Sequence, residues 1–202
     1  MEGITTFGIF RCAKEGSSLN GKYQKTMRPP GNVPYVVDNL WEWKRPEGCA
    51  DRRRSAYASP RVDLAQKSGP KGGIVYRVEF EGDVKLCQLV GYPDSKYHPD
   101  CRNLRSLLFG RLGQDWVDAD LSLKSEIGKL WIPCLTKFEV EWLFNTVGRL
   151  KEIREEVFQA ISYWDSVAVL KEGDTFPDDE GELFFEPMAG YRLIPLIWNA
   201  AH

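Results

Sequence analysis

The residues best placed to do chemistry are two glutamates near the end of the chain. Glu180 and Glu182 stand at the close of an acidic run and lead directly into the apolar segment Leu183-Phe184-Phe185. In an extended strand, side chains alternate between faces, so the two carboxylates share one face at a spacing of about 6.6 Å. A carboxylate pair held by a rigid strand at the edge of a cleft can stabilise positive charge and accept protons.

Two further segments carry candidate functional groups. Arg11 is embedded in an apolar, β-rich segment that begins near Ile4. Ser55-Ala56-Tyr57-Ala58-Ser59 reads as a short strand, and Pro60 then fits the first position of a helix for which Ser59 would be the N-cap. The chain has only two histidines, His98 and His202. Hydrolases of the Ser-His-Asp type and histidine-rich metal sites are therefore excluded, and no metal site is expected.

Length and composition are those of an ordinary soluble globular protein with one domain or two small ones. The chain has 202 residues, and 43% of them are hydrophobic, enough for a sizeable core. The net charge of −2 argues against nucleic acid as the main partner. Five widely spaced cysteines indicate reduced thiols. No apolar run approaches the ~20 residues that span a membrane, and no signal peptide is visible. We expect a protein that is cytoplasmic, or delivered to a target cell without a classical signal peptide.

Periodicity and turn signals predict an α+β fold. A helix is expected from Pro34 to a stop near Pro46, with Trp41 and Trp43 in the core, and a capping box at Thr136 predicts another helix start. An amphipathic helix is expected from Val147 to Trp164. Strands 73–80 and 84–90 flank the turn Glu81-Gly82-Asp83 and are predicted to form a hairpin; strand 166–170 and two closing strands complete the chain. His98 is expected in a loop.

In this order and over this length, the three segments resemble the ADP-ribosyltransferase superfamily. That family has an Arg (or His) on its first strand, a Ser-x-Ser or Tyr-containing strand followed by a helix, and a late Glu-x-Glu strand. The resemblance covers roughly residues 7–197. It implies one α+β ADP-ribosyltransferase-like domain over residues 1–202, with a mostly antiparallel split sheet and flanking helices.

The resemblance also implies an activity and roles for the candidate residues. NAD would be the substrate, and Glu182 would stabilise the oxocarbenium-like transition state formed as nicotinamide leaves. Glu180 would orient and deprotonate the acceptor. Arg11 would hold the diphosphate or its ribose. Three residues of the middle strand would also bind the cofactor. Ser55 would position both the cofactor and Glu182, and Tyr57 would offer its ring to nicotinamide. Ser59 is the third.

In the family, the Glu-x-Glu form accompanies modification of arginine side chains. The implied reaction is therefore mono-ADP-ribosylation of an acceptor macromolecule, a protein side chain such as arginine. Transferases of this size are often toxins or secreted effectors, which is an analogy at the level of the fold.

Three other functions fit parts of the sequence. An NAD glycohydrolase would use the same site with water as acceptor. A non-catalytic binding module would dock on nucleic acid or an acidic protein through the basic loop 44–54, where Arg52-Arg53-Arg54 reads as a solvated run. A polysaccharide hydrolase using Glu180 and Glu182 ranks last, because neighbours on one strand face cannot flank a scissile bond.

Overall fold

The computed structural model describes residues 8–118, 126–171 and 173–196, which fold into helices and two antiparallel sheets. The fold class is α+β, as the sequence predicts. The sequence predicts one domain over residues 1–202. The chain divides into two compact units: unit 1 comprises residues 1–26, 48–94 and 167–202, and unit 2 comprises residues 27–47 and 95–166. In the part of the chain that is described, no helix is both long and apolar enough to cross a membrane.

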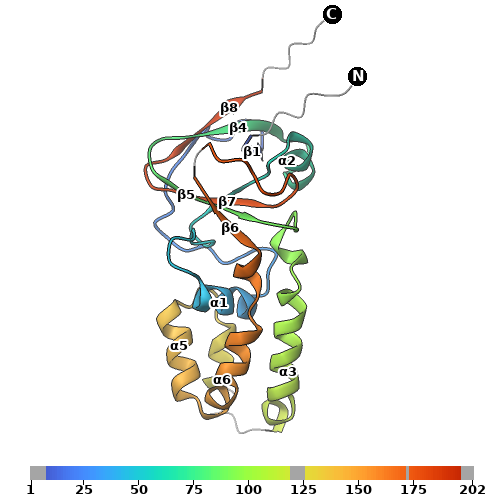
Figure 1. Cartoon of the computed structure of the whole chain (residues 1–202), viewed down its shortest axis with the longest axis vertical. Coiled ribbons are helices and arrows are strands. Elements are labelled where there is room, and N and C mark those ends of the chain that lie inside the picture. Colours follow the sequence, from blue (N-terminus) through green and yellow to red (C-terminus); the bar gives the residue numbers. More distant parts are fainter. Residues whose placement is uncertain (1–7, 119–125, 172, 197–202) are drawn as a thin grey trace, which may run out of the picture. The chain divides into compact units, whose positions relative to one another are not determined.

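Unit 1 contains both sheets (Figure 1). The first has the order β1-β4-β8-β2, and its strands are β1 (Phe10–Ala13), β4 (Ile74–Phe80), β8 (Tyr191–Pro195) and β2 (Asn20–Gly21). The second has the order β3-β7-β5-β6, and its strands are β3 (Ala56–Ala58), β7 (Leu183–Pro187), β5 (Val84–Leu89) and β6 (Val167–Leu170). Every strand pair in the described part of the chain is antiparallel.

The hairpin expected from residues 73–90 does not form, although both of its strands do. β4 pairs with β1 and β8, whereas β5 pairs with β7 and β6. The turn at Gly82, whose φ is +86°, therefore carries the chain from one sheet to the other. Val78 on β4 and Leu86 on β5 face the same core. Alternation correctly predicts a buried face on each strand, but it carries no information about which strand lies alongside.

The core of unit 1 is formed by the facing surfaces of the two sheets. Its centre includes Phe185 and Tyr191, whose rings meet edge to face at 5.1 Å, and Ala56, Ala58, Leu183 and Leu193 surround them. Helix α2 (Val62–Ser68) packs through Ala65 on Phe10 of β1. Its N-cap is Arg61, so the expectation that Ser59 caps this helix is wrong. The Ser59 backbone instead forms a bridge with Phe10.

Unit 2 is helical. Its helices are α1 (Tyr35–Lys44), α3 (Asp100–Asp118), α5 (Lys137–Thr146) and α6 (Gly148–Ala160), and short 3-10 turns are η1 (Ser95–Tyr97), η2 (Lys129–Trp131) and η3 (Tyr163–Ser166). Trp41 and Trp43 are buried as predicted. The capping box is also confirmed, since Thr136 Oγ1 accepts the Glu139 N–H and Glu139 accepts the Thr136 N–H. Helix α6 ends at Ala160, earlier than predicted, and the chain then turns into η3.

A buried polar network fixes the start of α3. The carboxylate of Asp100 accepts hydrogen bonds from the Trp41 indole (2.9 Å), the Ser162 hydroxyl (2.7 Å) and the Tyr163 N–H (3.0 Å). His98 is buried beside it, and its Nδ1 accepts the N–H of Asp100. His98 lies in a loop between η1 and α3, as expected, but the loop is packed and its side chain is buried. The short motif around His98 gives no periodic signal from which burial could be inferred.

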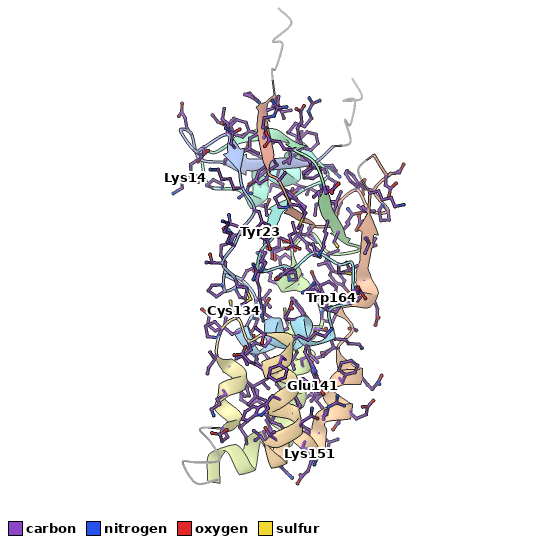
Figure 2. All side chains as sticks on the ribbon, turned by 90° about the vertical axis from the view of Figure 1, so that its left-hand side faces the viewer. Lys14, Tyr23, Cys134, Glu141, Lys151 and Trp164 are labelled. Carbon is purple, nitrogen blue, oxygen red and sulfur yellow. The ribbon has the colours of Figure 1, made fainter. Side chains whose placement is uncertain are left out.

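A second carboxylate joins three helices of unit 2. Glu141 on α5 accepts hydrogen bonds from the Trp43 indole on α1, from Asn145 and from Arg154 on α6. Figure 2 shows Glu141 among these helices. Partial burial opposes ionisation of Glu141, but the hydrogen bonds outweigh this effect and lower its pKa. Because the folded-state pKa is depressed, the stabilisation is present above the unfolded pKa and is lost as the pH falls through the folded pKa.

We therefore expect Glu141→Gln to lower the free energy of unfolding by about 1 kcal/mol at pH 7. The difference from the wild-type protein should shrink as the pH falls below the ordinary glutamate pKa, because both side chains are then neutral. Urea unfolding at a series of pH values measures this difference. A difference that stays constant down to pH 3 would contradict the assigned role.

Candidate active site at the β3–β7 junction

The three segments singled out in the sequence are neighbours in the fold. The backbones of Phe10 and Ser59 exchange hydrogen bonds of 2.9 and 2.8 Å, which attach β1 to the end of β3. β3 pairs in turn with β7, in the register Ala56↔Phe185 and Ala58↔Leu183. The segment carrying Arg11, the hydroxyl-bearing segment and the late acidic segment therefore lie next to one another in unit 1.

Glu182 is held rigidly just before β7. Its N–H donates to the carbonyl of Tyr92, and its carbonyl accepts the N–H of Leu89, both at 2.9 Å. The side chain is only 11% exposed, and its carboxylate lies 3.7 Å from the guanidinium of Arg52. A carboxylate fixed in this way is ready to act on a neighbouring group without first being ordered.

Arg52 is the centre of this site, although the sequence did not single it out as a site residue. Its guanidinium lies over the rings of Tyr57 (5.5 Å) and Phe184 (5.6 Å), a cation–π arrangement. The Tyr57 hydroxyl donates to the Arg52 carbonyl at 2.9 Å. The available signal was the basic run directly before the middle strand, but a short basic run resembles a solvated loop in any sequence.

The basic run is in fact packed against the protein. Arg52 is 5% exposed and Arg53 is 3% exposed, so the expectation of a solvated run is wrong for both. Arg54 is partly buried and lies 3.3 Å from Asp51. The loop folds inwards because Glu186, on the β7 face that also carries Glu182, accepts the N–H of Asp51. Glu186 thus anchors the loop to the sheet through a backbone hydrogen bond.

The hydroxyl-bearing residues have distinct environments. Ser55 is completely buried, and its Oγ donates to the Asp51 carbonyl at 2.7 Å, so it fixes the loop rather than facing a ligand. Tyr57 is half-buried, with its ring near that of Phe184. Continuing the β3–β7 register beyond Ala58 places Ser59 opposite Glu182. Ser59 is also buried, so of the three only Tyr57 is partly open to a ligand near this carboxylate.

Glu180 does not share a strand face with Glu182, because β7 begins only at Leu183. Glu180 lies in the preceding bend, is 61% exposed, and sits 3.3 Å from Arg61. The bend depends on Gly181: a Cβ there would approach the Leu89 carbonyl oxygen to 2.3 Å. The strand periodicity assumed from the sequence therefore fails at this glycine.

Arg61 links the start of α2 to this bend. It forms an ion pair with Asp63 at 2.9 Å in addition to its contact with Glu180. The hydrogen bond from Arg61 is the main cause of the lowered pKa of Asp63, and the same bond raises the pKa of Arg61. The bend therefore presents a carboxylate and a guanidinium side by side at the surface.

The side chain of Arg11 lies on the core side of the first sheet, away from the face of the second sheet that carries Glu182. Its Nη1 donates to the hydroxyl of Tyr191 at 2.5 Å, and Tyr191 belongs to the core between the sheets. Leu183 belongs to the same core, so Glu182, the next residue along the chain, is directed to the opposite face. The structure brings the backbones of Arg11 and Glu182 close through β3, but it does not bring their side chains into one cluster.

A cavity of about 720 Å³ lies beside the acidic segment, a volume typical of ligand sites. Its apolar wall comes from Ile9, Val78, Phe80 and Leu86, and its rim comes from the chain leading to β7, including Asp174, Asp178 and Asp179. Among the described residues of this rim, three aspartates outnumber the one lysine, Lys171, and an acidic balance disfavours a diphosphate and favours a cationic group.

Comparisons of this chain with protein-family models, curated proteins and solved structures found no match. Within residues 8–118, 126–171 and 173–196, no group of three or more His, Cys, Asp or Glu side chains is arranged to hold a metal ion.

The Arg52–Glu182 contact yields a stability prediction. Arg52→Met should lower the free energy of unfolding by about 3 kcal/mol, because it leaves a largely buried carboxylate without its cation. Arg77→Met is the matched control, since the ion pair of Arg77 with Glu79 is exposed and should contribute less than about 1 kcal/mol. Denaturant unfolding of both variants tests this difference. Equal losses would mean that Arg52 does not hold Glu182.

Proposed function

We propose that this protein is an NAD-dependent mono-ADP-ribosyltransferase. The observation that supports this proposal best is the position of Glu182: a largely buried carboxylate just before β7, held beside Arg52, whose guanidinium also covers the ring of Tyr57. The adjacency of the strands that carry Arg11, Tyr57 and Glu182 agrees with the resemblance found in the sequence.

The proposed reaction breaks the bond between the ribose C1 and the nicotinamide nitrogen, and its electron pair leaves with neutral nicotinamide. The ribose passes through an oxocarbenium-like state, whose positive charge the carboxylate of Glu182 stabilises. Arg52 holds that carboxylate in place, and Tyr57 offers its ring to nicotinamide. A nucleophilic atom of the acceptor then bonds to C1 and releases its proton to Glu180.

Arg11 is proposed to hold the diphosphate or its ribose. For this role the Arg11 side chain would have to leave the Tyr191 hydroxyl and turn from the core side towards the face that carries Glu182, in exchange for a phosphate oxygen as a stronger, charge-assisted partner. The acceptor is proposed to be a protein side chain, arginine being the family's precedent. The acidic rim of the 720 Å³ cavity suits a cationic group of this kind. A toxin or effector role would be consistent with such chemistry.

The exposure of Glu180 supports a second candidate, an NAD glycohydrolase. Glu180 is 61% exposed and engaged by Arg61, so it is not preorganised to activate a particular acceptor, and water could take that place. The binding-module alternative is less well supported, because two of the four arginines of its docking loop 44–54, Arg52 and Arg53, are buried.

Glu182→Gln should reduce nicotinamide release from NAD at least a hundredfold. The reason is that the amide keeps the shape of the side chain but removes the charge that stabilises the transition state. The substitution should also lower the free energy of unfolding, because the buried Arg52 guanidinium loses its charged neighbour, so circular dichroism must show that the variant is folded at the assay temperature. Chromatographic measurement of nicotinamide gives the rate, with Glu79→Gln in the exposed part of β4 as control. Full activity in Glu182→Gln would refute the proposed reaction.

Glu180→Gln separates transfer from hydrolysis. We expect nicotinamide release to stay within about threefold of the wild-type rate, and transfer of labelled ADP-ribose to protein acceptors to fall at least tenfold, because only the transfer step needs this base. Mass spectrometry of acceptor proteins and nicotinamide release are measured in the same reaction. An equal fall in nicotinamide release and in ADP-ribose transfer would contradict the separate roles proposed for Glu180 and Glu182.

A further inference from the structure

Large apolar side chains gather on the outer surface of unit 2. Phe109 on α3 is 55% exposed, Trp142 on α5 is 45% exposed, and Ile132 after η2 is 50% exposed. Lys129 of η2 lies 6.0 Å above the ring of Trp142, which places η2 next to α5 at this surface. Such residues seldom cluster on a soluble protein unless the surface binds something.

Part of this surface is hollow. A cavity of about 190 Å³ is lined by Leu108, Phe109 and Leu112 of α3, together with Gly128 and Trp131. Its walls are almost entirely apolar. An apolar cavity of roughly 150 Å³ is large enough to hold benzene, so this one can accept a single Phe or Leu side chain.

The same side of α3 carries positive charge. Arg102, Arg105, Phe109 and Leu112 follow the three- and four-residue spacing of one helix face. Arg102 and Arg105 are exposed, and within the described residues neither forms an ion pair. The cavity is therefore flanked along the helix by two guanidiniums that are available to a partner.

We propose that this face of α3 and η2, defined by Arg102, Arg105, Phe109, Leu112 and Trp131, is a docking surface for an amphipathic helix of a partner protein. The partner places one large apolar side chain in the 190 Å³ cavity and sets acidic side chains against Arg102 and Arg105. A central aromatic anchor with a charged rim is the usual composition of a protein-binding hot spot. This surface lies within unit 2 and does not depend on the proposed enzymatic function.

The first test uses a synthetic helical peptide as the probe. The fluorescent peptide carries Leu or Phe at positions i, i+3, i+4 and i+7 and Glu on both flanks; a second peptide has every Glu replaced by Lys. Fluorescence anisotropy should show saturable micromolar binding of the acidic peptide to the wild-type chain and at least tenfold weaker binding of the basic peptide. Absence of saturable binding, or equal binding of both peptides, would overturn the proposal.

Variants locate the binding on the chain. Phe109→Ser should weaken binding of the acidic peptide at least tenfold, and the double variant Arg102→Glu/Arg105→Glu should do the same and restore binding of the basic peptide. Tyr97→Ser is the matched control, because Tyr97 is an equally exposed aromatic residue of unit 2 outside this surface. Circular dichroism checks that each variant is folded. Wild-type affinity in Phe109→Ser would overturn the assignment.

Two further measurements test whether a second copy of the chain or a lipid surface, and not a partner helix, binds to this surface. Light scattering over a range of concentrations would detect self-association; association that Phe109→Ser abolishes would assign the surface to a second copy of the chain instead. Sedimentation with phosphatidylserine vesicles would detect a lipid surface; vesicle binding that requires Phe109 would assign it to a membrane instead. Either result would overturn the assignment of this surface to a partner helix.

Discussion

The strand β3 is the element on which the arrangement of unit 1 depends. It has only three residues, yet it pairs with β7 along its length, and Ser59, just after it, is bridged to Phe10 of β1. Because β1 belongs to one sheet and β7 to the other, this short segment joins the two. Its core-facing residues, Ala56 and Ala58, are small enough for the sheets to approach each other around Phe185 and Tyr191. Larger residues at these two positions would separate the sheets and displace Glu182 from its neighbours.

The site shows how one buried cation can organise several elements. Arg52 lies beside Glu182 and over Tyr57, and its backbone carbonyl accepts the Tyr57 hydroxyl. A guanidinium suits this position because its flat face can cover an aromatic ring while its edge meets a carboxylate. The loop 48–54 is held to the sheet at further points by Ser55 and by Glu186. The carboxylate and the ring proposed to meet NAD are thus ordered before any ligand arrives.

The sequence was most informative where local chemistry determines structure. The capping box at Thr136, the burial of Trp41 and Trp43 and the positions of most strands follow from side-chain preferences within a few residues, and they are confirmed. Partner choice between strands is a long-range property, so the hairpin of β4 with β5 was predicted wrongly. Glu180 and Glu182 were placed on one strand face because alternation assumes an extended chain, whereas the close approach of Gly181 to Leu89 bends it. The burial of Arg52 depends on Glu182 and Glu186, more than a hundred positions away, and no local pattern contains that information.

The insertion of residues 95–166 between β5 and β6 has a consequence for the order of folding. β5 must pair with β6 and β7, both of which follow the helical unit in the sequence. If that intervening stretch were unstructured, bringing its ends together would cost entropy and slow assembly of the second sheet. The neighbouring helices α5 and α6 pack on each other, and contacts between such sequence neighbours form quickly. The network around Asp100 ties the start of α3 to η3 at the two ends of the insertion. If the helices of residues 95–166 fold first, they bring the chain ends that lead to β5 and β6 together, and the second sheet then pairs at a lower entropic cost.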